Sequence, residues 1–169
     1  MCSSDLRAVL AGFPAAQNAL AALYEQQLGI PSADSCLMLG LRYYTGGAPA
    51  LGVWFFRHAA VGNAQAEALL GDAYSRGYGV RYNYLESLRR FYDAACRGYA
   101  PAQFVIAEQL DFFPDALQQL PDSLLPAACG RVADPEYWRA SALQAGITDA
   151  RQAADSLLST PNLINTDTI

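Results

Sequence analysis

Residues 64–98 read AQAEALLGDAYSRGYGVRYNYLESLRRFYDAACRG, and their apolar residues recur at steps of three and four. This spacing is typical of amphipathic helices, so it predicts one helix over 64–76 and a second over 84–97. Asn63 is expected to cap the first helix and Gly77 to end it, because asparagine favours N-caps and glycine tolerates left-handed backbone. No alternating run of β-branched residues competes with this pattern. The stretch therefore predicts a helix–turn–helix unit.

The same pattern recurs on the N-terminal side of this unit. Residues 39–47 (LGLRYYTGG) align with 70–78 (LGDAYSRGY), and residues 54–66 (WFFRHAAVGNAQA) align with 90–102 (RFYDAACRGYAPA). Aromatic, small and glycine positions coincide in both alignments. Self-similarity of this kind predicts a repeat architecture in which neighbouring units cover each other's apolar faces.

A third copy begins at Ala100 and is interrupted by a proline-containing insertion at 111–135. The repeat resumes at Trp138, which matches the tryptophan at position 54. The poorer helical segment at 15–28 and the last helix, near 148–158, are expected to cap the two ends of the array, because a terminal repeat has no neighbour to cover its apolar face.

The chain has 169 residues, of which 53% are hydrophobic and 16% charged, as expected for one folded domain. With 16 acidic and 11 basic residues, its net charge is -5. This balance argues against nucleic acid or an anionic membrane surface as the main partner. No stretch reaches the ~20 apolar residues that a membrane-spanning helix requires, so no membrane insertion is expected.

The first thirty residues lack the basic start and apolar run of an export signal, so the chain as given is expected to be cytoplasmic. The opening MCSSDL, however, resembles translated sequencing-adapter sequence. In that case residues 1–12 are in part non-native, and a missing export signal would place the protein in the periplasm or at the envelope. The repeat domain is expected over 13–158, followed by a tail at 159–169.

The four cysteines are far apart and form no CxxC pair, which excludes an ordinary zinc site. We expect free, core-packed thiols, as in a reducing compartment. A bridge between Cys36 and Cys96 remains an open alternative.

No set of residues predicts catalysis, a cofactor or a bound metal. His58, the only histidine, occupies a repeat position at which the other copies have alanine, so it is expected to be structural. The glycines of GDAYSRGYGV follow a helix rather than a strand and are interpreted as turn residues. Four acidic residues without a basic neighbour, at 108, 111, 115 and 122, fit no EF-hand spacing and predict a solvated surface in preference to a cation site.

The ten tyrosines fall into two groups. Tyr43 and Tyr74 occupy the core position of their repeats. The tyrosines of predicted loops do not lie on an apolar helix stripe, so periodicity does not predict their burial. Recognition of a partner and packing of the loop itself are about equally expected for them. They are Tyr78, Tyr82, Tyr84 and Tyr99.

The combined pattern LGxxY, then GxG with a valine, then an aromatic residue followed by paired alanines and glycine, resembles the Sel-one-like repeat (SLR) family, a relative of the tetratricopeptide repeat. The middle copy, 64–98, matches best, and the resemblance extends to 33–110 and 136–158. It implies an all-α, right-handed α/α solenoid of about three to four helix pairs. It also implies a non-enzymatic scaffold or adaptor that binds a protein or peptide. Alternatives are an immunity protein that neutralises a secreted lipase-type toxin and, less favoured, an enzyme with an unrecognised site.

Carrying the tetratricopeptide-like geometry onto the first helix of each unit predicts a partner-binding stripe beside the core stripe. Its mixture of apolar and acidic residues would suit an apolar partner segment flanked by basic residues. The predicted stripe residues are Asp34, Leu37, Leu41, Tyr44, Gln65, Asp72, Ser75, Phe104, Glu108 and Asp111, and Ala68 and Pro101 lie on the same stripe.

Overall fold

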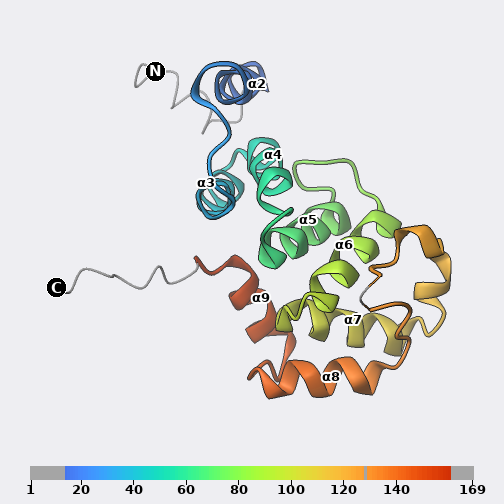
Figure 1. Cartoon of the computed structure of the whole chain (residues 1–169). Coiled ribbons are helices and arrows are strands. Elements are labelled where there is room, and N and C mark those ends of the chain that lie inside the picture. The colour runs from blue at the N-terminus through green and yellow to red at the C-terminus, as the bar shows by residue number, and fades with distance from the viewer. Residues whose placement is uncertain (1–13, 128, 161–169) are drawn as a thin grey trace.

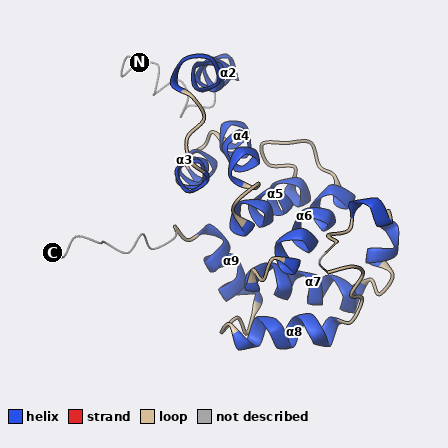
Figure 2. Ribbon diagram, in the orientation of Figure 1, coloured by secondary structure: helices blue, strands red, loops and turns tan. Residues whose placement is uncertain are grey.

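The computed structural model describes residues 14–127 and 129–160. Within these residues the chain is all-helical, with eight α-helices and no strand (Figure 1 and Figure 2). The all-α prediction is therefore confirmed for the described part of the chain. The predicted N-terminal segment 1–12 and residues 161–169 of the predicted tail lie outside it.

The α-helices and shorter helical turns follow one another along the chain without large interruptions before residue 112. They are α2 (Pro14–Leu23), the π-helical turn η1 (Tyr24–Leu28), α3 (Ala33–Thr45), α4 (Pro49–Ala59), α5 (Ala64–Arg76), α6 (Tyr84–Cys96), α7 (Ala100–Phe112), the 3-10 turns η2 (Ala116–Gln119) and η3 (Asp122–Leu124), α8 (Pro135–Gln144) and α9 (Ala150–Leu158).

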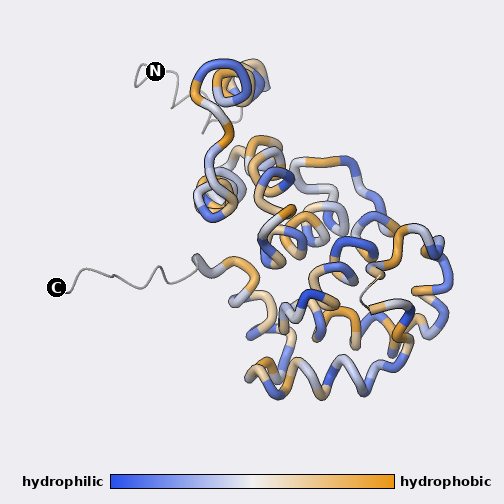
Figure 3. Tube along the Cα trace, in the orientation of Figure 1, coloured by the Kyte–Doolittle hydropathy of each residue, from blue (hydrophilic) through white to orange (hydrophobic). Residues whose placement is uncertain are grey.

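The helices pack as three sequence-adjacent pairs: α3 with α4, α5 with α6, and α7 with α8. The pairs are joined because α4 also packs against α5, and α6 against α7. Figure 3 shows that apolar and polar residues alternate along every helix, as expected when each helix buries one face. One continuous core runs through all three pairs, from Leu20 in α2 to Leu157 in α9.

The ends of α5 confirm the sequence prediction in detail. The Asn63 side chain accepts a hydrogen bond from the Ala66 backbone N–H at 3.1 Å, which satisfies one of the free donors of the first turn. At the other end Gly77 has a φ of 64°, a left-handed conformation that glycine adopts without steric cost.

Glycine allows the two helices of a pair to approach closely. A Cβ atom added to Gly71 in α5 would lie 2.8 Å from the ring of Phe91 in α6. In the first pair, a Cβ atom on Gly40 would lie 2.5 Å from the ring of Phe56. Both distances are too short for a side chain, so these two positions require glycine.

The irregular segment predicted at 111–135 is shorter at both ends in the structure, because residues 111–112 belong to α7 and residue 135 to α8. Between these two helices the described residues form only the short turns η2 and η3. This segment departs from the regular helix pair because its prolines cannot donate helical hydrogen bonds.

The two terminal segments behave differently from each other. Helix α2 packs against α4, next to the first pair, as expected of a cap. Helix α9, in contrast, packs against α7 and also against α5 in the preceding pair (Figure 1). The expectation that α9 simply caps the last repeat is therefore wrong: the helix lies back across the first helices of two pairs.

None of the described helices combines the length and the hydropathy needed to cross a bilayer.

Candidate functional site

The first helices of the three pairs are linked on one side of the molecule, which we call the inner face: a hydrogen bond joins α3 to α5, and α9 packs against both α5 and α7. Helix α9 covers part of this face and buries its own Ala153 and Leu157 against it. Its last residues extend the contact further, because Leu158 lines a hollow together with Leu41 of α3. The inner face therefore already holds one amphipathic helix of the chain itself.

Three hydrogen bonds hold the C-terminal end of α9. The Gln65 side chain of α5 donates to the backbone carbonyls of Leu157 at 2.9 Å and Ser159 at 2.7 Å. The Tyr99 hydroxyl donates to the carbonyl of Ser156 at 3.2 Å. These donors satisfy carbonyls that a helix end leaves without an intrahelical partner.

The predicted partner-binding stripe is only partly on the surface. Leu37, Leu41 and Tyr44 of α3 are buried, as are Asp72 of α5 and Phe104 of α7. Their burial has a physical cause: α4 packs against α3, Tyr44 also bonds Asp72 of α5, and α9 packs against α7. The remaining predicted stripe residues are half-buried (Gln65, Glu108) or exposed (Asp34, Ser75, Asp111), while the adjacent Ala68 and Pro101 are buried.

A buried polar network joins α3 to α5 within this stripe. The Tyr44 hydroxyl donates to Asp72 Oδ2 at 3.1 Å, and Arg76 Nε lies 2.8 Å from Asp72 Oδ1. Burial, and then the nearby Asp72 charge, raises the pKa of Tyr44 far above its ordinary value. Burial also raises the pKa of Asp72, although the charge of Arg76 opposes this shift. The network fixes the relative position of two repeats.

A cavity of about 270 Å³ remains between α9 and the helices of the inner face. Its walls are mostly apolar, and charged or polar groups stand among them. The apolar wall includes Phe91, Phe104, Val105, Ala154 and Leu157, and the polar groups are Asp72, Arg76, Glu108 and Gln109. Such a combination can hold an apolar group and orient a polar one beside it.

A second charged network lies between α5 and α6. Arg90 bonds both oxygens of the buried Glu67 carboxylate, at 2.9 Å and 3.1 Å, and Arg90 and Arg89 both donate to Glu86. Burial raises the pKa of Glu67. Hydrogen bonds from Arg89, and then from Arg90, lower the pKa of Glu86 to about 2. This fully paired network is structural in character.

The cysteine prediction is wrong for two of the four residues. Cys96 at the end of α6 forms a disulfide with Cys129, across a Cα–Cα distance of 5.6 Å. The alternative bridge between Cys36 and Cys96 is thereby overturned, and Cys36 is a buried free thiol whose pKa burial raises. Cys2 lies outside the described residues. Sequence spacing gave no signal for the observed pair, because its proximity depends on the path of the irregular segment.

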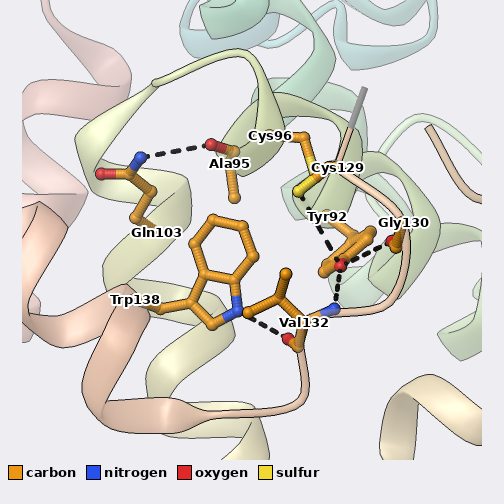
Figure 4. Close-up of a disulfide and its surroundings, with 8 residues drawn as sticks. All are labelled: Tyr92, Ala95, Cys96, Gln103, Cys129, Gly130, Val132 and Trp138. Carbon is orange, nitrogen blue, oxygen red and sulfur yellow. Dashed lines mark hydrogen bonds between the residues drawn. A yellow bond between two sulfur atoms is a disulfide. The ribbon is translucent and has the colours of Figure 1, made fainter. Parts of the chain in front are cut away.

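The disulfide belongs to a cluster that fastens the irregular segment to α6 (Figure 4). The Tyr92 hydroxyl donates to the Gly130 carbonyl at 2.9 Å and accepts from the Val132 N–H at 2.7 Å. The Trp138 indole donates to the Val132 carbonyl at 2.8 Å. One covalent bond and three hydrogen bonds therefore replace the helix packing that the segment lacks.

The loop tyrosines divide between the two expected roles. Tyr84 donates to Gln109 and Tyr99 to Ser156, so both are structural in this arrangement. Tyr78 packs edge-on against Tyr44, with ring centroids 4.9 Å apart. Tyr82 is 61% exposed and makes no ring contact with another described aromatic residue. It is the loop tyrosine best placed for recognition.

The residues considered for chemistry are dispersed. The ring of His58 lies against Trp54, with centroids 4.4 Å apart. Asp111 is paired with Arg139, and Asp122 with Arg131. No group of three or more histidine, cysteine or acidic residues in residues 14–127 and 129–160 could hold a metal ion.

Comparison with known proteins assigns no family to the chain. No protein-family model matches the chain, and no curated protein is similar to it. The resemblance to the SLR family accordingly stays a prediction from the residues quoted above.

Proposed function

We propose that the chain is a non-enzymatic protein-binding scaffold, a right-handed α/α solenoid of SLR type, that holds an apolar segment of a partner protein on its inner face. The observation that carries the proposal is the packing of α9. An amphipathic helix with small and apolar residues lies there across α5 and α7, so the surface is suited to a helix of that kind.

The cavity beside α9 supports the same proposal. Val105 and Leu158 are accessible at its wall, and Glu108, which forms no ion pair within the described residues, supplies a negative charge nearby. A partner side chain with an apolar stem and a basic end would fill the cavity and meet Glu108. The proposed partner segment is therefore apolar with a flanking basic residue.

Quantitative affinity capture from the native host tests this function. The parent chain is compared with Val105→Asp, which places a charge in the cavity wall, and with Val61→Asp. Val61 is 88% exposed after α4, so it provides the same substitution away from the inner face. A captured protein should then be purified and its affinity for all three chains measured.

We expect the parent and Val61→Asp to bind the partner equally and Val105→Asp to bind it at least roughly tenfold more weakly, because a buried unpaired charge costs more than ~1.4 kcal/mol. Equal binding by all three chains would show that the inner face is not the binding site. Failure of the parent to enrich any protein would count against the scaffold function itself.

We further propose that the protein works outside the cytoplasm. The Cys96–Cys129 disulfide supports this location, since structural disulfides persist mainly in oxidising compartments. The same observation favours the second candidate function, immunity to a secreted lipase-type toxin, because such a toxin is met outside the cytoplasm. A captured lipase whose activity falls to zero at one equivalent of the parent chain would select that candidate over a general adaptor.

A further inference from the structure

A second hollow, of about 560 Å³, lies away from the cavity beside α9. It is formed by α4, α5 and the loop that joins α5 to α6. Its lining residues are Arg57, Tyr74 and residues 79–83, which read GVRYN. None of these residues is acidic.

The charges of this hollow are unusual for the protein. Ten of the 11 arginines lie in the described residues, and seven of them have a carboxylate within 4.0 Å. The three that lack one, among residues 14–127 and 129–160, are Arg42, Arg57 and Arg81. Two of these three line the same hollow. In a chain with 16 acidic residues, two arginines of one hollow thus have no carboxylate within 4.0 Å among the described residues.

Both arginines have donors to spare. Arg57 makes one hydrogen bond, from Nη2 to the Tyr74 hydroxyl at 3.3 Å, which orients its guanidinium across the gap between α4 and α5. Arg81 makes no hydrogen bond or ion pair within the described part of the chain. Because the Tyr74 oxygen accepts from Arg57, its own proton can be donated to a ligand.

The loop that carries Arg81 is fixed before any ligand arrives. Gly79 has a φ of 77° and packs so tightly that a Cβ atom would lie 2.5 Å from the carbonyl of Pro49. The Asn83 N–H donates to the Tyr74 carbonyl at 3.1 Å, and the Asn83 side chain caps α6. A preformed loop reduces the entropy that binding must overcome.

We propose that this hollow is a binding site for a dianionic oxyanion of the phosphate-monoester class. Two unpaired guanidinium groups match two negative charges, and each planar fork can donate two parallel hydrogen bonds to phosphate oxygens. Tyr74 adds a neutral donor. The exposed ring of Tyr82 offers an apolar surface for an organic group attached to the phosphate. The site is independent of the inner face and does not rest on the scaffold function.

Isothermal titration calorimetry of the full chain tests the site, at low ionic strength and in a phosphate-free buffer. The probes are inorganic phosphate, phenyl phosphate and acetate. The variants are Arg57→Gln and Arg81→Gln, and the control is Arg151→Gln, which removes the same charge from a 91% exposed side chain on α9. Circular dichroism confirms that each variant is folded.

We expect saturable binding of phosphate at one site. Each of the two site variants should weaken it roughly tenfold, since each removes a charge-assisted pair, and Arg151→Gln should leave it unchanged. Tighter binding of phenyl phosphate, lost in Tyr82→Ala, would assign an organic phosphate. Equal affinity of the two phosphates would assign the free ion.

Three results would overturn the proposal: no saturable binding of either phosphate, acetate binding as tightly as phosphate, or equal weakening by Arg151→Gln and the site variants. The last result would indicate a response to net charge alone. Arg81→Gln removes no hydrogen bond of the described chain, so it keeps the test decisive even if Arg57→Gln fails to fold.

Discussion

The Tyr44 hydroxyl donates a hydrogen bond, 3.1 Å long, to the buried carboxylate of Asp72, 28 residues further along the chain. The contact joins the first helix of one repeat to the first helix of the next. Because Asp72 also pairs with Arg76, whose side chain reaches the surface, its buried charge has two partners. Two residues that the sequence placed on a binding surface thus bind each other.

Replacing Tyr44 with Phe should lower the free energy of unfolding by ~1–3 kcal/mol, because the Asp72 carboxylate loses a hydrogen bond in a buried site. Urea denaturation at pH 7 measures the loss. Tyr43→Phe is the matched control, since the neighbouring Tyr43 is also buried but its hydroxyl makes no hydrogen bond within the described residues. Equal losses in the two variants would show that the Asp72 contact is not the stabilising one.

Gly71→Leu should destabilise the chain by ~1–3 kcal/mol, because the new side chain would enter the space of the Phe91 ring. Gly62→Leu is the control. A Cβ atom there would meet only the Ala33 Cβ, at an ordinary distance of 3.5 Å. Thermal denaturation followed by circular dichroism distinguishes the two, and an unchanged melting temperature for Gly71→Leu would contradict the close packing of α5 and α6.

Reduction of the Cys96–Cys129 disulfide should lower stability by ~3–4 kcal/mol, as the bond closes a loop of 33 residues in the unfolded chain. The loss is measured by urea denaturation with and without reductant. Cys129→Ser should reproduce it and abolish the sensitivity to reductant. Cys36→Ala should leave that sensitivity intact, because Cys36 is a free thiol. A parent chain that is indifferent to reductant would refute the bridge.

Glu86→Gln should destabilise the chain at pH 7 by ~1–2 kcal/mol, a value reduced from the full pKa shift because this side chain is 24% exposed. The folded pKa is lowered from 4.5 to about 2, chiefly by the hydrogen bond from Arg89. The stabilisation is therefore present above pH 4.5 and lost as the pH falls toward 2.

The stability difference between parent and Glu86→Gln, measured by urea denaturation from pH 7 to pH 2, isolates this group from other carboxylates. Asp72 and Glu67 act in the opposite direction, because their pKa values are raised and protonation favours the folded state. Glu136→Gln is the control, at a 77% exposed carboxylate. A difference that does not shrink at low pH would contradict the assignment.

Local features of the fold could be predicted from the sequence because they depend on neighbouring residues. The helix at 64–76, its Asn63 cap and the glycine at its end all follow from periodicity and backbone chemistry. Register between helices could not be predicted in this way. The alignment pairs Phe55 with Phe91, yet the residue that contacts Gly40 is Phe56. The shorter loop of the first pair lets α4 pack one position out of register with α6.

Features that depend on distant segments were missed for the same reason. The sequence pattern placed Leu37 and Phe104 on an open stripe, because it could not reveal which later segment would cover them. Nor could it bring Cys129 to Cys96, since the path of residues 113–134 is set by the Tyr92 and Trp138 contacts. Nothing in the sequence indicated the hydrogen bond between Tyr44 and Asp72, except that both residues were assigned to the predicted partner-binding stripe.

The polar contacts that hold α9 all end on main-chain oxygens. Gln65 and Tyr99 donate to the carbonyls of residues 156, 157 and 159, and no side chain of α9 takes part in these three bonds. Every residue type offers the same carbonyl, so the outward residues of α9 can change over evolutionary time without altering its attachment. For the same reason, Gln65 and Tyr99 do not recognise the side chains of the helix end that they hold. Selection among helices then depends on shape and on small inward-facing residues such as Ala153. They would tolerate wide sequence variation in whatever helix they hold.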